Sequence, residues 1–450
     1  MPSTLIDSTI FGNLVGTAPM RAVFSDEHRI QRYLDVEAAL ARVQARLGII
    51  PQAAAAEIAD RCRVERFDLA KLREQTERAG SPVIGVVQQL SALCAPPHGR
   101  YCHWGATTQD ITDTATALQM REALALVGAE LAAIADALAG LARRYRDTPM
   151  AGRSHLQQAA PVTFGYKAAC LLSAIERHRA RLAELVPRVL VGEFGGAVGT
   201  LASLGAAGLE TRAALMRELG LGEPDIAWHT QRDRIAEAGC FLGLTTGTLA
   251  KLATDVKLLM QTEVGEVAEP FAPGRGASST MPQKRNPVSS VYIHACAAVV
   301  RQHAALLLEA MVADHERASG PWHIEWIVLP EAFVLTAGAL AHARAIVEGL
   351  QVDTGRMREN LELTHGLVVS EAVVMGLAPH LGRERAHDVV TELCRKAIEQ
   401  KRPLVDLLAE SPEVAAHVDR KRLAEWCDPA NYLGLAGAMV DRVLAARERR

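Results

Sequence analysis

The sequence predicts an all-α protein in which five long helices form a central bundle. Alanine and leucine dominate the composition, 49% of the residues are hydrophobic, and only 4% are aromatic. Alanine and leucine are strong helix formers, whereas sheets favour β-branched and aromatic side chains. Apolar residues also recur at helical spacing along uninterrupted runs that proline and glycine separate. These observations favour long packed helices over sheets.

Residues 1–105 form the first of three expected regions and hold short helices. Pro51, Gly80–Pro82 and Pro96–Gly99 interrupt this region. The segment Ser25–Gly48 starts with a residue type that caps helices. Its apolar side chains recur at helical spacing, at Ile30, Tyr33, Val36, Leu40, Val43 and Leu47.

Residues 106–350 form the second region, where long helices replace short ones. The expected helices are Thr112–Arg146, Val162–Val186, Arg232–Val267, Pro287–Ala318 and Ile324–Leu350. A helix of about 35 residues is about 50 Å long, and these helices carry apolar residues on more than one face. One chain supplies too few helices to cover those faces, so we expect packing against other copies of the chain. Residues 351–450 form a third region of shorter helices.

Composition also excludes several classes of protein. The formal net charge is −3 and no basic run is present, so we do not expect nucleic-acid binding. Judged by its apolar runs, the chain holds no stretch of the roughly 18–20 residues that a bilayer requires, so we expect no membrane span. The N-terminus lacks the features of a signal peptide. The eight cysteines form no CxxC pair, so we expect reduced thiols, no metal site and a cytoplasmic protein.

The segment Gly274–Pro287 is the most informative stretch for chemistry. It lies between two expected long helices, starts with two glycines, and carries two adjacent serines followed by two adjacent cations. Glycines give a mobile entry, and a proline suits the first turn of the next helix. A helix N-terminus beside Lys284 and Arg285 favours a carboxylate and lowers the proton affinity of a nearby serine. On composition alone, a solvated loop between helices explains the segment equally well.

The ten residues SSTMPQKRNP, Ser278–Pro287, closely resemble the signature loop of the fumarase/aspartase superfamily. This superfamily includes fumarase, aspartase, argininosuccinate lyase, adenylosuccinate lyase and 3-carboxy-cis,cis-muconate cycloisomerase. The resemblance implies that Ser278 is the catalytic proton carrier, with Ser279 beside it, and that Lys284 and Asn286 hold a substrate carboxylate. It also implies a homotetramer whose active sites are shared between subunits, a small polycarboxylate substrate and no cofactor.

Two further stretches precede expected long helices. In His103–Thr114, the hydroxyls alone would be read as helix caps. The stretch resembles the superfamily pattern H-x-G-x-T-S-x-D, which implies that Thr107 and Thr108 bind a carboxylate and that His103 lies in the pocket. In Gly152–Gly165, a lone histidine would be read as structural. The pattern G-R-S/T-H-x-Q there implies that His155 is an active-site residue.

Two other stretches contribute pocket candidates by the same resemblance. Within Trp228–Arg234, Gln231 is implied to form a hydrogen bond with the substrate, although alone it would pass for a polar helix cap. The stretch Asp314–Trp326 is similar to a segment of bacterial 3-carboxy-cis,cis-muconate cycloisomerases, which makes Arg317 and Trp322 pocket candidates. Without the resemblance, this stretch reads as a charged helix end followed by a turn.

Departures from the superfamily pattern narrow the expected reaction. Many members place a glutamate seven residues after the loop lysine, where it charges the catalytic histidine, but this chain has Val291. Without that carboxylate, His155 has less support for its protonated form. Elimination of hydroxide or amine needs a general acid, whereas a lactone opens to a carboxylate of pKa about 4 that needs none. The departure favours a cycloisomerase.

Two alternatives stay open. The first is a C–N lyase that releases fumarate from adenylosuccinate or argininosuccinate. Ala79–Ile84 stands where adenylosuccinate lyases carry a histidine–aspartate pair, and this weakens a purine nucleotide substrate. The second is a non-catalytic structural descendant of the superfamily, against which the serine, lysine and histidine argue.

Overall fold

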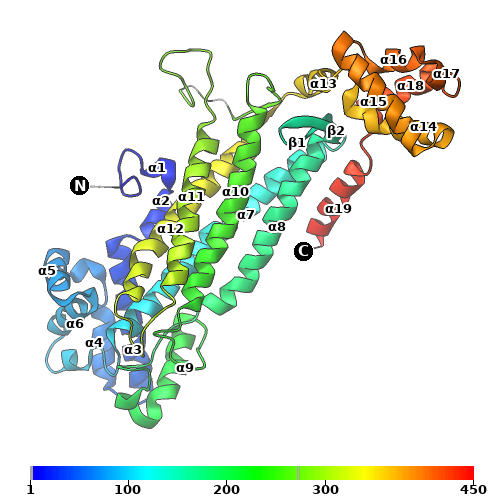
Figure 1. Cartoon of the computed structure of the whole chain (residues 1–450). Helices are drawn as coiled ribbons and strands as arrows, with labels where there is room; N and C mark the ends of the chain where they lie inside the picture. Colours follow the sequence, from blue (N-terminus) through cyan, green and yellow to red (C-terminus); the bar gives the residue numbers. More distant parts are fainter. Residues whose placement is uncertain (1–3, 271, 273, 450) are drawn as a thin grey trace. The chain divides into compact units, whose positions relative to one another are not determined.

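Five long helices dominate the computed structural model, which describes residues 4–270, 272 and 274–449 (Figure 1). They are α7 (Thr108–Arg144), α8 (Phe164–Val189), α10 (Asp233–Leu259), α11 (Val288–Glu309) and α12 (Pro321–Gly349). The mostly helical fold and the five long helices are therefore confirmed. Two of them are shorter than expected, because α10 ends before Val267 and α11 ends before Ala318. The segment after α10 is rich in glycine, β-branched residues and proline, and it turns into an extended strand.

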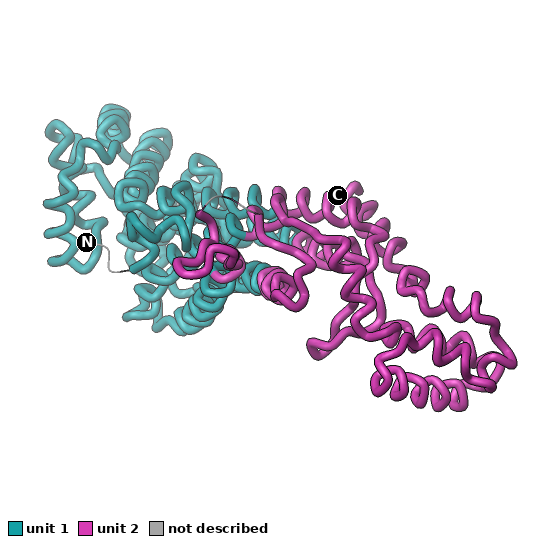
Figure 2. The backbone as a smooth tube through the Cα atoms, turned by 90° about the horizontal axis from the view of Figure 1, so that it is seen from above, with its two compact units in different colours: residues 1–131, 178–250, 292–342 teal, residues 132–177, 251–291, 343–450 magenta. Residues whose placement is uncertain are grey.

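The chain divides into two compact units, each assembled from three stretches of sequence (Figure 2). Unit 1 contains Met1–Leu131, His178–Ala250 and Tyr292–His342. Unit 2 contains Ala132–Arg177, Lys251–Val291 and Ala343–Arg450. All five long helices contribute residues to both units. The three expected regions, with limits at 105/106 and 350/351, remain a prediction from sequence.

Unit 1 adds short helices to its parts of the long ones. They are α1 (Gly12–Val15), α2 (Ala18–Val23), α3 (Asp26–Arg46), α4 (Gln52–Arg61), α5 (Leu69–Ala79), α6 (Pro82–Leu93) and α9 (Gly208–Leu219), with the 3-10 turns η1 (Val64–Arg66), η2 (His98–Tyr101) and η3 (Ala202–Ala207). The predicted cap of α3 is present, because the Ser25 side chain accepts a hydrogen bond from the His28 amide at 3.2 Å. The apolar face expected of this helix, from Ile30 to Val43, is buried.

Glycines let the long helices approach closely in unit 1. A Cβ atom at Gly239 of α10 would lie 2.4 Å from the Leu307 side chain of α11. A Cβ atom at Gly128 of α7 would lie 3.1 Å from the Leu182 side chain of α8. Small residues at such contacts bring helix axes together, which explains how alanine- and glycine-rich helices pack without large side chains.

Unit 2 contains a β-hairpin that the sequence did not predict, and its second strand includes the first two residues of the helix expected over Val162–Val186. Strand β1 (Pro149–Ser154) pairs antiparallel with β2 (Gln157–Thr163), and Ser154 lies opposite Gln157. The two-residue turn is His155-Leu156, with φ angles of 51° and 63°. Two positive φ angles characterise the type I′ turn, which matches the twist of hairpin strands. This turn exposes both side chains.

The rest of unit 2 is a two-stranded ribbon and a group of short helices. Strand β3 (Val267–Ala268) pairs antiparallel with β4 (Gln351–Val352). The helices are α13 (Thr354–Glu362), α14 (Ser370–Leu381), α15 (Arg383–Gln400), α16 (Leu404–Glu410), α17 (Pro412–Ala415), α18 (Arg420–Cys427) and α19 (Ala436–Glu448), with the 3-10 turns η4 (Leu367–Val369) and η5 (Pro429–Asn431). Helices α14 to α18 enclose an apolar core of their own that includes Val373, Leu393 and Leu423.

Three long helices contradict the expectation that no segment suits a membrane. By length and composition alone, α7, α11 and α12 each contain an 18-residue window that could cross a bilayer. Within the chain, 39% of the α7 window, 33% of the α11 window and 67% of the α12 window are buried. The expectation failed because alanine, which is small but apolar, fills the intervals between charges such as Glu130 and Asp136. More than half of the apolar window on α7 and on α11 is therefore not buried by the chain itself.

The residue that follows helix α15 has a left-handed backbone conformation, and its substitution tests the cost of that conformation. Lys401 follows the last residue of α15 and is exposed, with φ 52°, a conformation that glycine adopts without strain. We expect Lys401→Gly to stabilise the fold by about 1 kcal/mol. Lys396→Gly, inside the same helix, should destabilise it by about 1 kcal/mol. Urea unfolding followed by circular dichroism measures both variants, and a destabilised Lys401→Gly would contradict the assignment.

Candidate active site

The N-terminus of α7 brings two predicted pocket residues into contact in unit 1. The Arg317 guanidinium donates a hydrogen bond from Nη2 to Thr107 Oγ1 at 2.9 Å. Arg317 Nη1 is buried and has no partner among the described residues. Thr107 donates its amide N–H to Asp110 Oδ2 at 2.9 Å, which is half of a capping box. Thr107 therefore occupies the cap position, but its hydroxyl faces a cation rather than a free amide.

The other predicted site residues of unit 1 are His103, Thr108 and Gln231. His103 is held by α3, because its Nδ1 lies 2.6 Å from Glu37 Oε1 and its amide N–H donates to Glu37 Oε2 at 3.2 Å. Burial lowers the pKa of His103, but the Glu37 charge and hydrogen bond outweigh burial, so the pKa is raised overall. Thr108 begins α7, and its carbonyl accepts a hydrogen bond from Thr112 Oγ1 at 3.0 Å. Gln231 is exposed.

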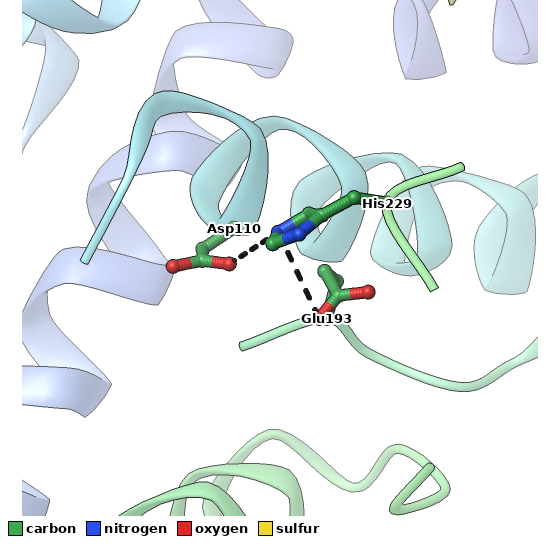
Figure 3. A group of neighbouring side chains, drawn as sticks. All are labelled: Asp110, Glu193 and His229. Atoms are coloured by element: carbon green, nitrogen blue, oxygen red, sulfur yellow. Dashed lines mark hydrogen bonds and ion pairs between the residues drawn. The ribbon is translucent and has the colours of Figure 1, made fainter. Parts of the chain in front are cut away.

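Asp110, Glu193 and His229 form a buried cluster that was not predicted from the sequence (Figure 3). His229 Nε2 lies 2.8 Å from Asp110 Oδ1 and 3.8 Å from Glu193 Oε1. The amide N–H groups of Gly195 and Gly196 donate to the Asp110 carboxylate at 2.8 and 3.0 Å. The three side chains are separated by up to 119 residues, so no local pattern could reveal them.

The chemistry of this cluster is that of a hydrogen-bond network. Carboxylate and imidazole ligand atoms within 4.8 Å of one another could hold a metal ion. However, three backbone N–H groups and the His229 ring converge on Asp110. This donor set already satisfies the carboxylate, and it orients the loop that carries Thr107. We assign the cluster a structural part in positioning that loop.

A second buried network lies one turn further along α7. Arg232 forms ion pairs with Asp113 at 2.7 Å and with Glu325 at 2.5 Å, and its guanidinium lies over the Trp228 ring at 4.8 Å. Trp322, a predicted pocket residue, is buried and donates its indole N–H to Asp113 Oδ1 at 3.0 Å. The indole N–H of Trp322 is therefore used within the protein and not offered to a ligand. A buried arginine with two carboxylate partners fixes the start of α10 against α7 and α12.

The loop 274–287 of unit 2 forms a closed turn that presents Ser278. Its base is a bridge between Ala277 and Arg285, and the Asn286 amide donates to the Gly276 carbonyl at 2.9 Å. At Gly276 φ is 67°, and a Cβ atom there would lie 2.5 Å from the Asn286 carbonyl oxygen, so only glycine fits. The expected mobile entry is thus a specific backbone turn.

Ser278 receives two backbone hydrogen bonds in this turn. The amide N–H groups of Thr280 and Met281 donate to Ser278 Oγ at 3.3 and 3.1 Å. Donors to a hydroxyl oxygen favour its deprotonated form, as a proton carrier requires. Ser278 is partly buried, whereas Ser279 and Lys284 are exposed and Asn286 is partly buried. These four polar side chains thus stand on one short loop.

The start of α11 differs from the expectation that it would bind a substrate carboxylate. The buried Glu269 carboxylate already accepts hydrogen bonds from the Ser289 and Ser290 amides, at 3.0 and 2.8 Å. It also accepts one from Ser290 Oγ at 2.7 Å. The protein's own carboxylate therefore uses the positive end of this helix. Val291, which follows Ser290 in the same turn of α11, is 51% exposed.

The buried cluster predicts a pH-dependent stability. Burial raises the pKa of Glu193 to about 7, despite the nearby His229 and a hydrogen bond from the Trp228 amide. The native state then holds a proton that the unfolded state loses near its ordinary pKa of 4.5, so this group makes stability fall as pH rises from 4.5 to 7. Glu193→Gln is isosteric and should match the parent near pH 5. By pH 8 the variant should unfold a few degrees higher than the parent in thermal scans. A difference that stays constant with pH would contradict a protonated Glu193.

Comparisons with known proteins identify the family of the chain. A family model described as lyase matches residues 13–301, and one described as adenylosuccinate lyase C-terminus matches residues 366–443. Trans-aconitate decarboxylase 1 of Mycosarcoma maydis is 55% identical over 99% of this chain and 90% of its own. A 3-carboxy-cis,cis-muconate cycloisomerase of Pseudomonas aeruginosa is 52% identical over 95% of this chain and 94% of its own. The crystal structure of 3-carboxy-cis,cis-muconate lactonizing enzyme from Pseudomonas putida, 44% identical, matches with a TM-score of 0.94 over 98% of this chain and 99% of its own. With a lyase model spanning more than half of its residues and relatives of this similarity, the chain belongs to the fumarase/aspartase superfamily of enzymes.

Proposed function

We propose that this enzyme is a cofactor-independent cycloisomerase that converts 3-carboxy-cis,cis-muconate to 4-carboxymuconolactone in the breakdown of aromatic acids. Val291 carries the proposal, because it stands where lyases of the superfamily place a glutamate that charges the catalytic histidine. Its half-exposed aliphatic side chain cannot charge a neighbouring imidazole. A lactone forms from a carboxylate that is already ionised, so this reaction tolerates the loss.

The proposed step needs one proton and one charge-stabilising site. One substrate carboxylate oxygen bonds to an alkene carbon, and the π electrons move to the carbon beside a second carboxylate. Ser278 Oγ delivers its proton to that carbon, and the Thr280 and Met281 amides stabilise the oxyanion left behind. Solvent returns a proton to the serine. His155 orients the substrate and assists proton traffic.

Cationic and hydroxyl groups are proposed to hold the three substrate carboxylates. Lys284 and Asn286 bind the carboxylate on which charge accumulates, with Ser279 beside them. Thr107 and Thr108 bind another, and Arg317 Nη1 supplies a buried N–H next to Thr107. His103 and Gln231 complete the polar surface of the pocket.

Ser278→Ala tests the proton carrier. We expect the substrate affinity to survive, because the carboxylate ligands remain, while kcat falls by about 10³-fold. Loss of the 3-carboxy-cis,cis-muconate diene absorbance in the ultraviolet measures turnover. Ser279→Ala is the matched comparison and should alter KM more than kcat. Near-normal turnover by Ser278→Ala would assign the proton transfer to another group.

Decarboxylation of trans-aconitate is the second candidate, favoured by the 55% identity to a protein named for it. Both compounds are unsaturated tricarboxylates, and both reactions add a proton to an alkene carbon near a carboxylate. The two reactions differ in the second bond that changes. Lactonisation forms a C–O bond, whereas decarboxylation breaks a C–C bond and releases carbon dioxide. The same serine and cations suit either step.

A product assay separates these candidates from each other and from the C–N lyases. The purified enzyme is incubated in parallel with 3-carboxy-cis,cis-muconate, trans-aconitate, adenylosuccinate and argininosuccinate, and products are followed by proton nuclear magnetic resonance. We expect a lactone without carbon dioxide from the first. Carbon dioxide and an unsaturated dicarboxylate from trans-aconitate would favour the second candidate, and fumarate would favour a lyase. Binding without any turnover would favour a non-catalytic descendant.

We also propose that other copies of the chain cover the long helices, as in a homotetramer. Large apolar side chains on α10 and α11 are 42–56% exposed in the single chain, including Leu244, Val299, Leu306 and Leu308. Exposed apolar patches of this kind mark contacts with other chains. Light scattering in solution measures the mass, and a value near the 48.4 kDa of one chain would contradict the proposal.

A further inference from the structure

Two buried glutamates flank strand β3 in unit 2 and contact different catalytic segments. Glu266 precedes the strand and Glu269 follows it, and their side chains are 0% and 5% exposed. Successive side chains of a strand point to opposite faces, so residues three apart face opposite ways. Glu266 and Glu269 therefore point to opposite faces of the β3–β4 ribbon.

Glu266 holds the first strand of the hairpin that carries His155. Arg153 Nη1 and Nη2 donate to the two Glu266 oxygens at 2.9 and 2.6 Å, a bidentate pair. Arg153 stands two residues before His155. Its Nη1 also donates to the Ala151 carbonyl at 3.3 Å, beside the irregularity in strand pairing between Ala151 and Arg153. Such irregularities redirect the side chains that follow them.

Asn360 of α13 extends this grip to the second strand. The Asn360 side chain donates from Nδ2 to Glu266 Oε1 at 2.8 Å. The Asn360 backbone carbonyl accepts a hydrogen bond from Gln158 Nε2, also at 2.8 Å. Gln158 lies directly opposite Arg153 in the hairpin. The four residues form a closed ring of contacts immediately below the His155-Leu156 turn, so both strands are fixed to Glu266.

Glu269 and its neighbours hold the other catalytic segment. Its carboxylate binds the first amides of α11, directly after the loop 274–287. Arg285, at the base of that loop, donates from Nη2 to the Glu269 carbonyl and to Gln351 Oε1, each at 3.2 Å. The ribbon is thus attached to the loop that presents Ser278 as well as to the hairpin.

We propose that Glu266 is a positioning residue for His155, acting through Arg153 and Asn360, and that Glu269 has the same part for the Ser278 loop. The proposal rests on the proposed function in taking His155 and Ser278 as the reacting residues. His155 has a φ of 51°, a left-handed conformation that costs free energy for any residue other than glycine. Contacts from outside the turn must therefore hold it. Without Glu266, Arg153 would be left partly unpaired and the hairpin free to shift.

A double-mutant cycle tests the link from Glu266 to His155. In the full-length enzyme, Glu266→Gln keeps the side-chain volume but removes the bidentate ion pair. A misplacement of about 1 Å costs about 100-fold in rate, so we expect kcat to fall between about 10- and 100-fold while KM changes little. In the His155→Ala background, Glu266→Gln should cause less than about a twofold further loss. Equal losses in both backgrounds would overturn the proposal, because Glu266 would then act independently of His155.

A matched control separates positioning from stability. Glu176 is also a buried carboxylate of unit 2 paired with an arginine, Arg447, at 2.8 Å, but it lies on α8, outside both the hairpin and the loop 274–287. Glu176→Gln should lower the unfolding temperature as much as Glu266→Gln does and leave kcat unchanged. An equal loss of kcat in this variant would show that general destabilisation explains the effect. Glu266→Asp, which keeps the charge, serves if Glu266→Gln does not fold, and it should lower kcat with the same dependence on His155.

Hydrogen exchange provides a readout that does not need the substrate. Glu266→Gln should speed amide exchange in the hairpin peptide 149–163 and leave the loop peptide 274–287 unchanged, and Glu269→Gln should do the reverse. Unchanged exchange in the hairpin would overturn the anchoring by Glu266. If the parent enzyme turns over no tricarboxylate, the proposed function fails, whereas this exchange pattern still decides whether the glutamates hold the two segments.

Discussion

Buried carboxylates bonded to N–H groups hold the loops that join the long helices, and the rest of the candidate site depends on them. Asp110 accepts backbone amides from its own helix start and from Gly195 and Gly196, while Glu269 accepts those at the start of α11. Charge-assisted bonds of this kind are short and strong, and an unmatched buried carboxylate is costly. Loops tied in this way have one low-energy arrangement, so side chains at their tips are presented in defined positions.

The same contacts divide the charged groups into those that build the site and those that remain for a ligand. Arg153 and Arg232 are engaged in ion pairs with buried glutamates or aspartates, and their loss would leave uncompensated charge. Lys284 stands exposed on the loop, and Arg317 keeps a buried N–H group without a partner among the described residues. Each of these two cationic side chains, one in each unit, thus keeps N–H groups that the ion pairs of Arg153 and Arg232 do not use.

Local patterns in the sequence predicted the elements whose cause is local. The long helices follow from alanine- and leucine-rich runs with a period of 3.6 residues, and the Ser25 cap follows from one residue type at one position. The hairpin 149–163 was missed because its strands are rich in alanine, proline and glutamine and its turn lacks the usual Asn-Gly. The end of α10 was misplaced because tertiary contacts of the residues that follow it, including Glu266 and Glu269, compete with helix propensity there.

The candidate site shows the same limit. Resemblance to known motifs pointed to Ser278, Lys284 and Thr107, since each lies in a contiguous stretch. His229, Glu193 and Glu266 could not be found that way, because their partners lie 35 to 119 residues away along the chain. The apolar composition of α7 and α11 was underestimated for a related reason, since alanine contributes hydropathy without the bulk that marks an obvious apolar run.

Val291 indicates how the chemistry of this scaffold can change while the fold is kept. Its side chain is half exposed on α11, and the cap of that helix is made by Glu269 through the Ser289 and Ser290 amides. A carboxylate at residue 291 is therefore not needed for the helix to start or to pack. Under the proposed function, a carboxylate at this position would change the charge available to the catalytic imidazole, and hence the leaving groups that the site can expel. In that proposal, proton delivery by Ser278 and the carboxylate ligands on the loops do not depend on residue 291. On this proposal, a single position on a helix surface separates reactions that need a strong general acid from those, such as lactonisation, that do not.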